Sequence, residues 1–108
     1  MGAILRVLGQ AYPTANTQTT LYACGTTSAV VSTFSMANTA GNADVITARI
    51  AVGGEADNNK QLLFSNLIIA ANSVLQLTAG FTFANTDILK VTSVNGTTSF
   101  QLFGQENS

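Results

Sequence analysis

The sequence predicts an all-β protein, a single antiparallel β-sandwich of jelly-roll-like or Ig-like type with about eight short strands. The apolar segments are short and rich in β-branched and aromatic residues, and clusters of Gly, Asn, Asp and Ser separate them. No segment repeats its apolar residues with the period of a helix. A chain of 108 residues suits one domain, 1-108, with one core.

The expected strands follow from these boundaries. In chain order they span residues 4–9, 19–24, 29–37, 45–52, 61–65, 74–78, 81–83, 88–94 and 98–103. The polar stretches 37–44 and 53–60 flank the fourth strand and are expected to be loops. A bulge or bend is expected at Gly80, between two of the shortest strands.

Side chains alternate between the two faces of a strand, so the pattern also predicts which residues share a face. The sets expected on one face are Val30, Phe34 and Met36; Ile46, Ala48, Ile50 and Val52; and Leu75, Leu77, Phe81 and Phe83. Phe34 and Met36 are expected to lie in the core. The opposite faces would then carry Val31, Thr33 and Ser35 in one strand and Arg49 in another.

The dipeptide Asn95-Gly96 predicts a β-hairpin, because a two-residue type I′ turn needs positive φ at both central residues. The register would place Val91 opposite Phe100. The expected core face holds Leu89, Val91, Phe100 and Leu102, and the expected outer face holds Lys90, Thr92, Ser99 and Gln101. That outer face carries one charge among hydroxyls and amides.

Charge is scarce along the whole chain. Charged residues make up 8% of it, against about 25% in typical globular proteins, and the net charge is −1. Four basic residues without a cluster do not provide the positive surface that phosphate backbones require, so no nucleic acid partner is expected. Protein molecules with few surface charges repel each other weakly and therefore associate readily. The composition therefore indicates a subunit of an assembly, and we expect a homo-oligomer.

The single cysteine, Cys24, excludes a disulfide within the chain and is expected to be a buried, small apolar side chain. No apolar run approaches the roughly 20 residues of a membrane-spanning helix, so no membrane partner is expected. The opening MGAILRVLGQ is interrupted by Arg6 and is too short for a signal peptide. We therefore expect the protein to be made and assembled in a cytoplasm.

The residues that most often carry catalysis are missing. The sequence has no histidine, which excludes Ser-His-Asp and Cys-His arrangements. Its carboxylates are Asp44, Glu55, Asp57, Asp87 and Glu106. Glu55 and Asp57 could form an acid and base pair, but residues two apart in a polar loop are normally solvated. We expect no enzyme activity, no catalytic residues and no cofactor-binding residues.

One stretch has a weak likeness to a calcium loop. Glu55, Asp57 and Asn59 stand at its positions one, three and five. Lys60 and Asn66 occupy the positions where such a loop needs a Gly and a bidentate Glu, so a solvated loop without metal is expected. The triplet NGT also fits a glycosylation acceptor formally, but the turn interpretation is preferred there.

Three longer stretches, VLGQAYPTANTQTTLY, SAVVSTFSMAN and IIAANSVLQLTAGFTFANTDILKVTSVNGTTSFQLFGQE, cover most of the chain. Taken in this order, they resemble small virion structural proteins of tailed bacteriophages, including cyanophages. The resemblance implies a β-sandwich, a structural role and no enzymatic activity. It does not distinguish capsid, tail and fibre.

The resemblance and the composition together lead us to expect a phage virion structural protein. The first hypothesis is a capsid decoration or cement protein that stabilises the head lattice, with the major capsid protein as partner. The alternative is a tail, baseplate or fibre component with tail proteins as partners. A carbohydrate-binding host-recognition module is a further alternative, although the chain has no Trp and only Tyr12 and Tyr22 as tyrosines. The expected location is the virion, assembled in the host cytoplasm.

Overall fold

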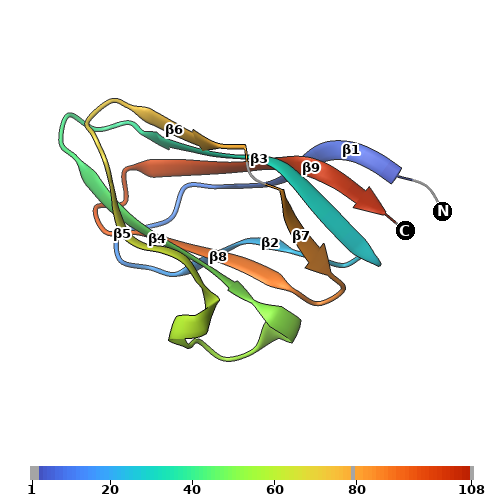
Figure 1. Ribbon diagram of the computed structural model, residues 1–108. Coiled ribbons are helices and arrows are strands. Elements are labelled where there is room, and N and C mark those ends of the chain that lie inside the picture. Colours follow the sequence, from blue (N-terminus) through green and yellow to red (C-terminus); the bar gives the residue numbers. More distant parts are fainter. Residues whose placement is uncertain (1–2, 79, 108) are drawn as a thin grey trace.

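The computed structural model describes residues 3–78 and 80–107 and contains two antiparallel β-sheets (Figure 1). Sheet I has the order β1 (Ala3–Ala11), β9 (Thr98–Asn107), β3 (Ser28–Asn38) and β6 (Val74–Leu77), and β7 (Phe81–Ala84) pairs with the first half of β3. Sheet II has the order β2 (Thr19–Ala23), β8 (Ile88–Ser93), β4 (Asp44–Ala51) and β5 (Leu62–Ile69). Figure 1 shows sheet I as the upper layer and sheet II as the lower layer.

The chain changes sheet at every connection except β4 to β5 and β6 to β7. When β6 and β7 are counted as one strand interrupted near Gly80, the strands form two four-stranded sheets in the order of a jelly roll. An Ig-like sandwich has a different strand order. The predicted antiparallel β-sandwich is confirmed. Each of the nine expected ranges overlaps one observed strand, so the described residues contain nine strands where about eight were expected.

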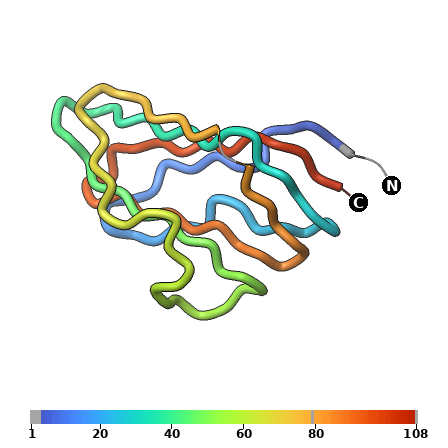
Figure 2. Tube along the Cα trace, viewed as in Figure 1, coloured from blue at the N-terminus to red at the C-terminus, as the bar shows by residue number. Residues whose placement is uncertain are grey.

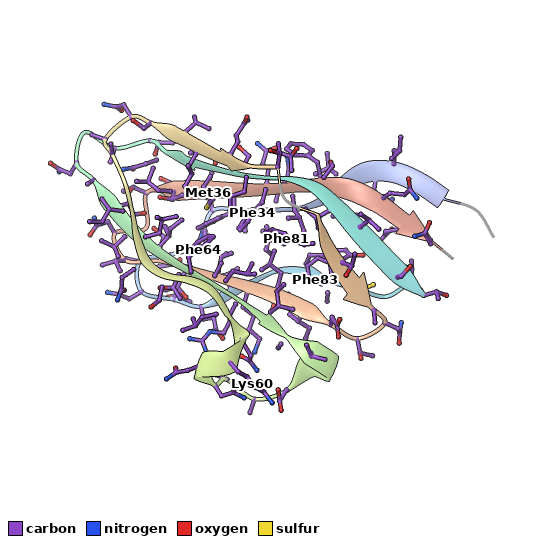
Figure 3. All side chains as sticks on the ribbon, in the orientation of Figure 1. Phe34, Met36, Lys60, Phe64, Phe81 and Phe83 are labelled. Carbon is purple, nitrogen blue, oxygen red and sulfur yellow. The ribbon has the colours of Figure 1, made fainter. Side chains whose placement is uncertain are left out.

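The two sheets bury one shared apolar core. Its buried side chains include Leu21, Val31, Phe34, Met36, Ile46, Ala48, Ile69, Phe83, Leu89, Val91, Phe100 and Leu102. Figure 3 shows Phe34, Met36, Phe64, Phe81 and Phe83 between the layers. Cys24 is buried, as predicted, whereas Val52 is exposed because β4 ends at Ala51.

The predicted hairpin is wrong. β8 lies in sheet II and β9 in sheet I, so residues 94–97 connect the two layers instead of two paired strands. Gly96 has a positive φ of 70°, but Asn95 does not have a positive φ, so no type I′ turn forms. The backbone N–H of Asn95 instead donates to the Asp44 carboxylate at 2.9 Å. The predicted core face is still right, because Leu89, Val91, Phe100 and Leu102 are all buried, but they come from facing sheets.

The predicted faces of β3 are wrong at its start. The register of β3 against β9 shifts between Val31 and Thr33, so Ser32 is an extra residue in a β-bulge. The bulge places Val31 in the core and turns Val30 outward. Gly104 lies opposite this bulge, and a Cβ there would stand 2.2 Å from the Val30 carbonyl oxygen. A glycine at this position therefore allows the bulge that brings Val30 to the surface.

The two chain ends lie at the same end of the sandwich, as the trace in Figure 2 shows. They do so because β1 and β9 are antiparallel neighbours that pair Ala3 with Asn107. At the lower side of the molecule, the connection between β4 and β5 contains two single-turn 3₁₀ helices, Val52–Gly54 and Asn59–Gln61. The molecule therefore presents one bare sheet face, that of sheet I, and one face flanked by a structured loop.

Candidate functional site

The outer face of sheet I carries a cluster of apolar side chains at the end where the chain termini lie. Strand register places Leu5, Gln105, Val30 and Thr82 in one row across four strands, and Val7, Phe103 and Thr33 in the next. Leu5 is 80% exposed, Val7 47% and Val30 41%, and Phe103 beside Val7 is half-buried. Val7 and Phe103 are direct cross-strand neighbours, about 5 Å apart, and Leu5 and Val30 lie diagonal to Phe103, about 7–8 Å away and within reach of its ring, so these four side chains form one patch around Gln105.

We refer to the outward-facing positions of sheet I as the neutral face. They are Leu5, Val7, Gln10, Ser28, Val30, Thr33, Ser35, Ala37, Val74, Gln76, Thr82, Ala84, Ser99, Gln101, Phe103, Gln105 and Asn107. None of the four basic and five acidic side chains of the sequence lies among them. Arg6 and Glu106 occupy the opposite side of the same sheet, because Glu106 has the same strand parity as the buried Phe100 and Leu102.

Charged side chains gather instead on the outer face of sheet II and its loop, which we refer to as the charged face. It consists of Arg49, Glu55, Asp57, Lys60 and Lys90. Arg49 and Lys90 are cross-strand neighbours, and the Asp57 carboxylate accepts from Lys90 Nζ at 3.2 Å and from Gln18 Nε2 at 3.1 Å. These two hydrogen bonds hold the pKa of Asp57 below its usual value, and the bond from Lys90 has the larger effect.

The loop between β4 and β5 is ordered by its own side chains. Asn58 caps the second 3₁₀ helix by accepting from the Lys60 backbone N–H at 3.0 Å, and Gln61 Nε2 donates to the Ala56 carbonyl at 2.9 Å. An open depression of about 590 Å³ lies at this loop. It is lined by Ile50, Val52, Glu55, Lys60 and Gln61. Figure 3 shows Lys60 on this loop, away from the layers of the sandwich.

In the structure Glu55 and Asp57, the possible acid and base pair of the sequence, pair with different lysines. Glu55 pairs with Lys60 of the same exposed loop at 3.4 Å, and Asp57 pairs with Lys90 of β8 at 3.2 Å. The same ion pairs engage the carboxylates of Glu55 and Asp57, which are two of the three residues that resemble the ligands of a calcium loop. Within residues 3–78 and 80–107, no group of three or more His, Cys, Asp or Glu side chains could hold a metal ion.

Asp44 is a residue whose role the sequence did not reveal. It opens β4, is fully buried, and its carboxylate accepts from the hydroxyls of Ser93 and Thr98 and from the backbone N–H groups of Asn95 and Val45. Burial is the largest influence and raises the pKa of Asp44, but the hydrogen bonds together outweigh it and keep the pKa below its usual value. Asp44 thereby links β4 and β8 of sheet II to the start of β9 in sheet I.

A second carboxylate links the sheets near the chain termini. Glu106 of β9 accepts from the Tyr22 hydroxyl of β2 at 2.6 Å and from the Arg6 guanidinium of β1 at 2.9 Å. These two hydrogen bonds, that of Tyr22 first, lower the pKa of Glu106. Burial, followed by the bond to Glu106, raises the pKa of Tyr22. The ionised form of Glu106 is therefore the one that the fold stabilises.

The buried polar groups are satisfied within the protein. Asp87 accepts from the backbone N–H groups of Gly53 and Ala84, each at 2.9 Å. In the part of the chain that the structure describes, no buried side-chain nitrogen or oxygen lacks a hydrogen-bond partner. These carboxylates are thus engaged in holding the fold together.

The described residues contain no helix with the length and apolar character needed to cross a membrane. Comparison with family models, curated proteins and solved structures finds no match to this chain.

Proposed function

We propose that this chain is a structural protein of a phage virion, namely a capsid decoration or cement protein that stabilises the head lattice. The resemblance of its sequence to small virion proteins supports the virion part of the proposal. One structural observation supports the assembly part of the proposal. One sheet face has no charged side chains, and four apolar side chains cluster at one end of it. Contiguous apolar surface that is rimmed by polar residues is typical of protein interaction sites.

The mechanism follows from the chemistry of this face. Amides and hydroxyls that become buried in a contact lose less hydration free energy than ions do, and they regain it by pairing with a partner's polar groups. Apolar side chains such as Leu5 and Val30 add a favourable free energy in proportion to the apolar area that the contact buries. Weak contacts of this kind join the subunits of an assembly, and attachment of such an assembly at the many equivalent sites of a symmetric shell sums to a strong hold without any single strong bond.

Two other roles are alternatives. A tail, baseplate or fibre component would use the same kind of surface and would differ in its number of copies. A carbohydrate-binding module usually presents exposed aromatic rings. Tyr22 is buried, which leaves Tyr12, 59% exposed, as the exposed tyrosine around which such a site would form. A glycan array probed with the purified protein tests that role.

Quantitative gel densitometry of purified virions tests the proposed function. A lattice-binding subunit occupies every equivalent site of the shell, so the expected result is on the order of hundreds of copies per particle, in a constant ratio to the major capsid protein. A copy number on the order of ten would contradict the cement role and would favour a tail component. Absence of the protein from purified particles would contradict the virion role altogether.

A further inference from the structure

We infer that the partner of the neutral face is a second copy of this chain, in a twofold dimer in which two neutral faces stack on one another. This inference rests on the assembly role proposed for that face, but it does not depend on the virion. Three features of the described residues lead to it: the distribution of charge, the size of the face, and the arrangement of its apolar and polar side chains.

The distribution of charge favours self-association. A twofold interface brings the same patch from both copies together, so a charged residue near the axis would meet its own copy. Like charges that face each other in a contact destabilise it, and a buried charge without a partner is worse. The neutral face has no charged side chain, so two copies can stack without either penalty. A different partner that is recognised by charge would instead meet the charged face.

The neutral face has about the size that a stable dimer needs. Four strands spaced about 4.8 Å apart, and a length of about 34 Å for β9, give roughly 650 Å² in projection. Projecting side chains make the accessible area larger than the projected area. A standard interface buries about 800 Å² on each partner, so stacking over most of this face would reach that range.

The side chains also have the layout of an interface. The apolar patch of Leu5, Val7, Val30 and Phe103 would supply a dry centre, because sheets that stack face to face pack about 10 Å apart with their side chains interdigitated. The amide of Gln105 lies between Leu5 and Val30 within this patch, the amide of Gln101 lies beside Phe103 on the same strand, and both would pair with polar groups across the contact.

An exposed apolar residue outside the neutral face provides a matched control. Ile68 of β5 is 68% exposed and faces outward from sheet II, where its cross-strand neighbour is Val45. It is on the opposite side of the sandwich from Val30, which is 41% exposed on β3. A lysine at either position keeps its charge in water in the monomer, so only the substitution at Val30 should affect a contact between neutral faces.

Sedimentation velocity of the purified chain tests the inference over a concentration series. The wild type is expected to sediment as a dimer in the micromolar range. Val30→Lys should raise the dimer dissociation constant at least tenfold, because two lysines would enter the contact. Ile68→Lys should leave it unchanged. Thermal melting establishes that each variant is folded, and Leu5→Lys, at a position 80% exposed on the same face, replaces Val30→Lys if the latter does not fold.

A wild type that stays monomeric at about 100 µM would overturn the inference, since a standard interface normally binds more tightly than that. So would a dimer that survives both lysine substitutions on the neutral face, or one that Ile68→Lys weakens as strongly. These measurements use the isolated chain, so a negative result leaves the copy number in virions as a separate test of the proposed function.

Discussion

The two outer faces of this sandwich differ in a way that the overall composition conceals. The charged face carries Arg49, Lys90 and the ion pairs of the neighbouring loop, whereas the neutral face carries amides, hydroxyls and apolar side chains only. If a shortage of charge were merely a habit of composition, the few charged residues would be expected on both faces. Five of the nine charged side chains lie on the charged face and none lies on the neutral face, a contrast that the proposed contact would explain.

The remaining charges are placed where they hold the two sheets together. Asp44 lies at one end of β4 and Glu106 near the end of β9, and each accepts hydrogen bonds from groups on both sheets. Their side chains face the interior, so they do not interrupt the neutral face. The contrast between the faces therefore separates residues that stabilise the fold from residues that are available for assembly, and mutations can test that separation.

Neighbouring residues of β9 give the largest expected difference. Phe100 is fully buried between the sheets, whereas Gln101 points outward on the neutral face. Phe100→Ala should lower the free energy of unfolding by about 3–5 kcal/mol, and Gln101→Ala should change it by about 0.5 kcal/mol or less. Chemical denaturation of the monomeric chain, at a concentration too low for association, measures both. Equal losses would mean that the neutral face contributes to the fold.

A smaller effect is expected from the charge buried between the sheets. Asp44→Asn should destabilise the protein by about 2–3 kcal/mol at pH 7, because it weakens several hydrogen bonds to a carboxylate. The pKa of Asp44 is lowered in the folded state, so its stabilisation is present above the unfolded pKa of about 3.9 and is lost as the pH falls through the lower folded value.

Thermal melts from pH 7 to pH 2 check this prediction. The melting temperatures of the wild type and Asp44→Asn should begin to converge as the pH falls below about 4 and should meet below the lowered folded pKa, where the wild-type carboxylate is also neutral. Asp57→Asn is the surface control, since Asp57 is exposed on the loop of the charged face, and it should have little effect. A constant difference between wild type and Asp44→Asn at every pH would contradict the structural role of the carboxylate.

The hydrogen bond between Tyr22 and Glu106, which links the two sheets near the chain termini, should contribute less to stability than the Asp44 carboxylate. Tyr22→Phe removes one hydrogen bond to Glu106, which keeps its ion pair with Arg6, so we expect a loss of about 1–2 kcal/mol in urea denaturation. Tyr12→Phe is the matched control, because Tyr12 is exposed and its hydroxyl lies 3.4 Å from that of Thr39. If both substitutions had the same effect, the bond between Tyr22 and Glu106 would not link the sheets.

The smallest effect is expected from calcium. Lys60 and Lys90 already neutralise Glu55 and Asp57 on the charged face, so millimolar calcium should leave the melting temperature unchanged. A ligand that binds only the folded state raises the melting temperature in proportion to the logarithm of its concentration. Such a rise would show that the loop binds calcium and that the charged face has a function of its own.

Much of the fold could be predicted from local patterns. Alternation in β4 placed Ile46 and Ala48 in the core, and the same pattern kept Leu75, Leu77, Phe81 and Phe83 on one side across Gly80. The dipeptide Asn95-Gly96 correctly marked a connection between two strands, although not as the predicted hairpin turn. It could not show that the strands belong to different sheets, because β8 pairs with β4 and β9 pairs with β1 and β3, which are all distant in sequence.

The candidate site was harder to predict for the same reason. Val30 is on the neutral face only because Ser32 forms a bulge opposite Gly104, and neither residue signals a bulge locally. The shortage of charge was visible in the composition, but its confinement to one face depends on the order of β1, β9, β3 and β6. Long-range pairing decides which strands share a face, and single-strand periodicity contains no information about it.

The salt dependence of self-association measures directly whether this protein assembles through an uncharged surface. Raising the salt concentration to about 1 M shrinks the screening length to about 3 Å and weakens contacts between charged groups. Sedimentation equilibrium in about 0.05 M and about 1 M sodium chloride should give dimer dissociation constants within about twofold of each other. A dissociation constant that rises tenfold or more with salt would show that the charged face mediates the contact and would contradict the account.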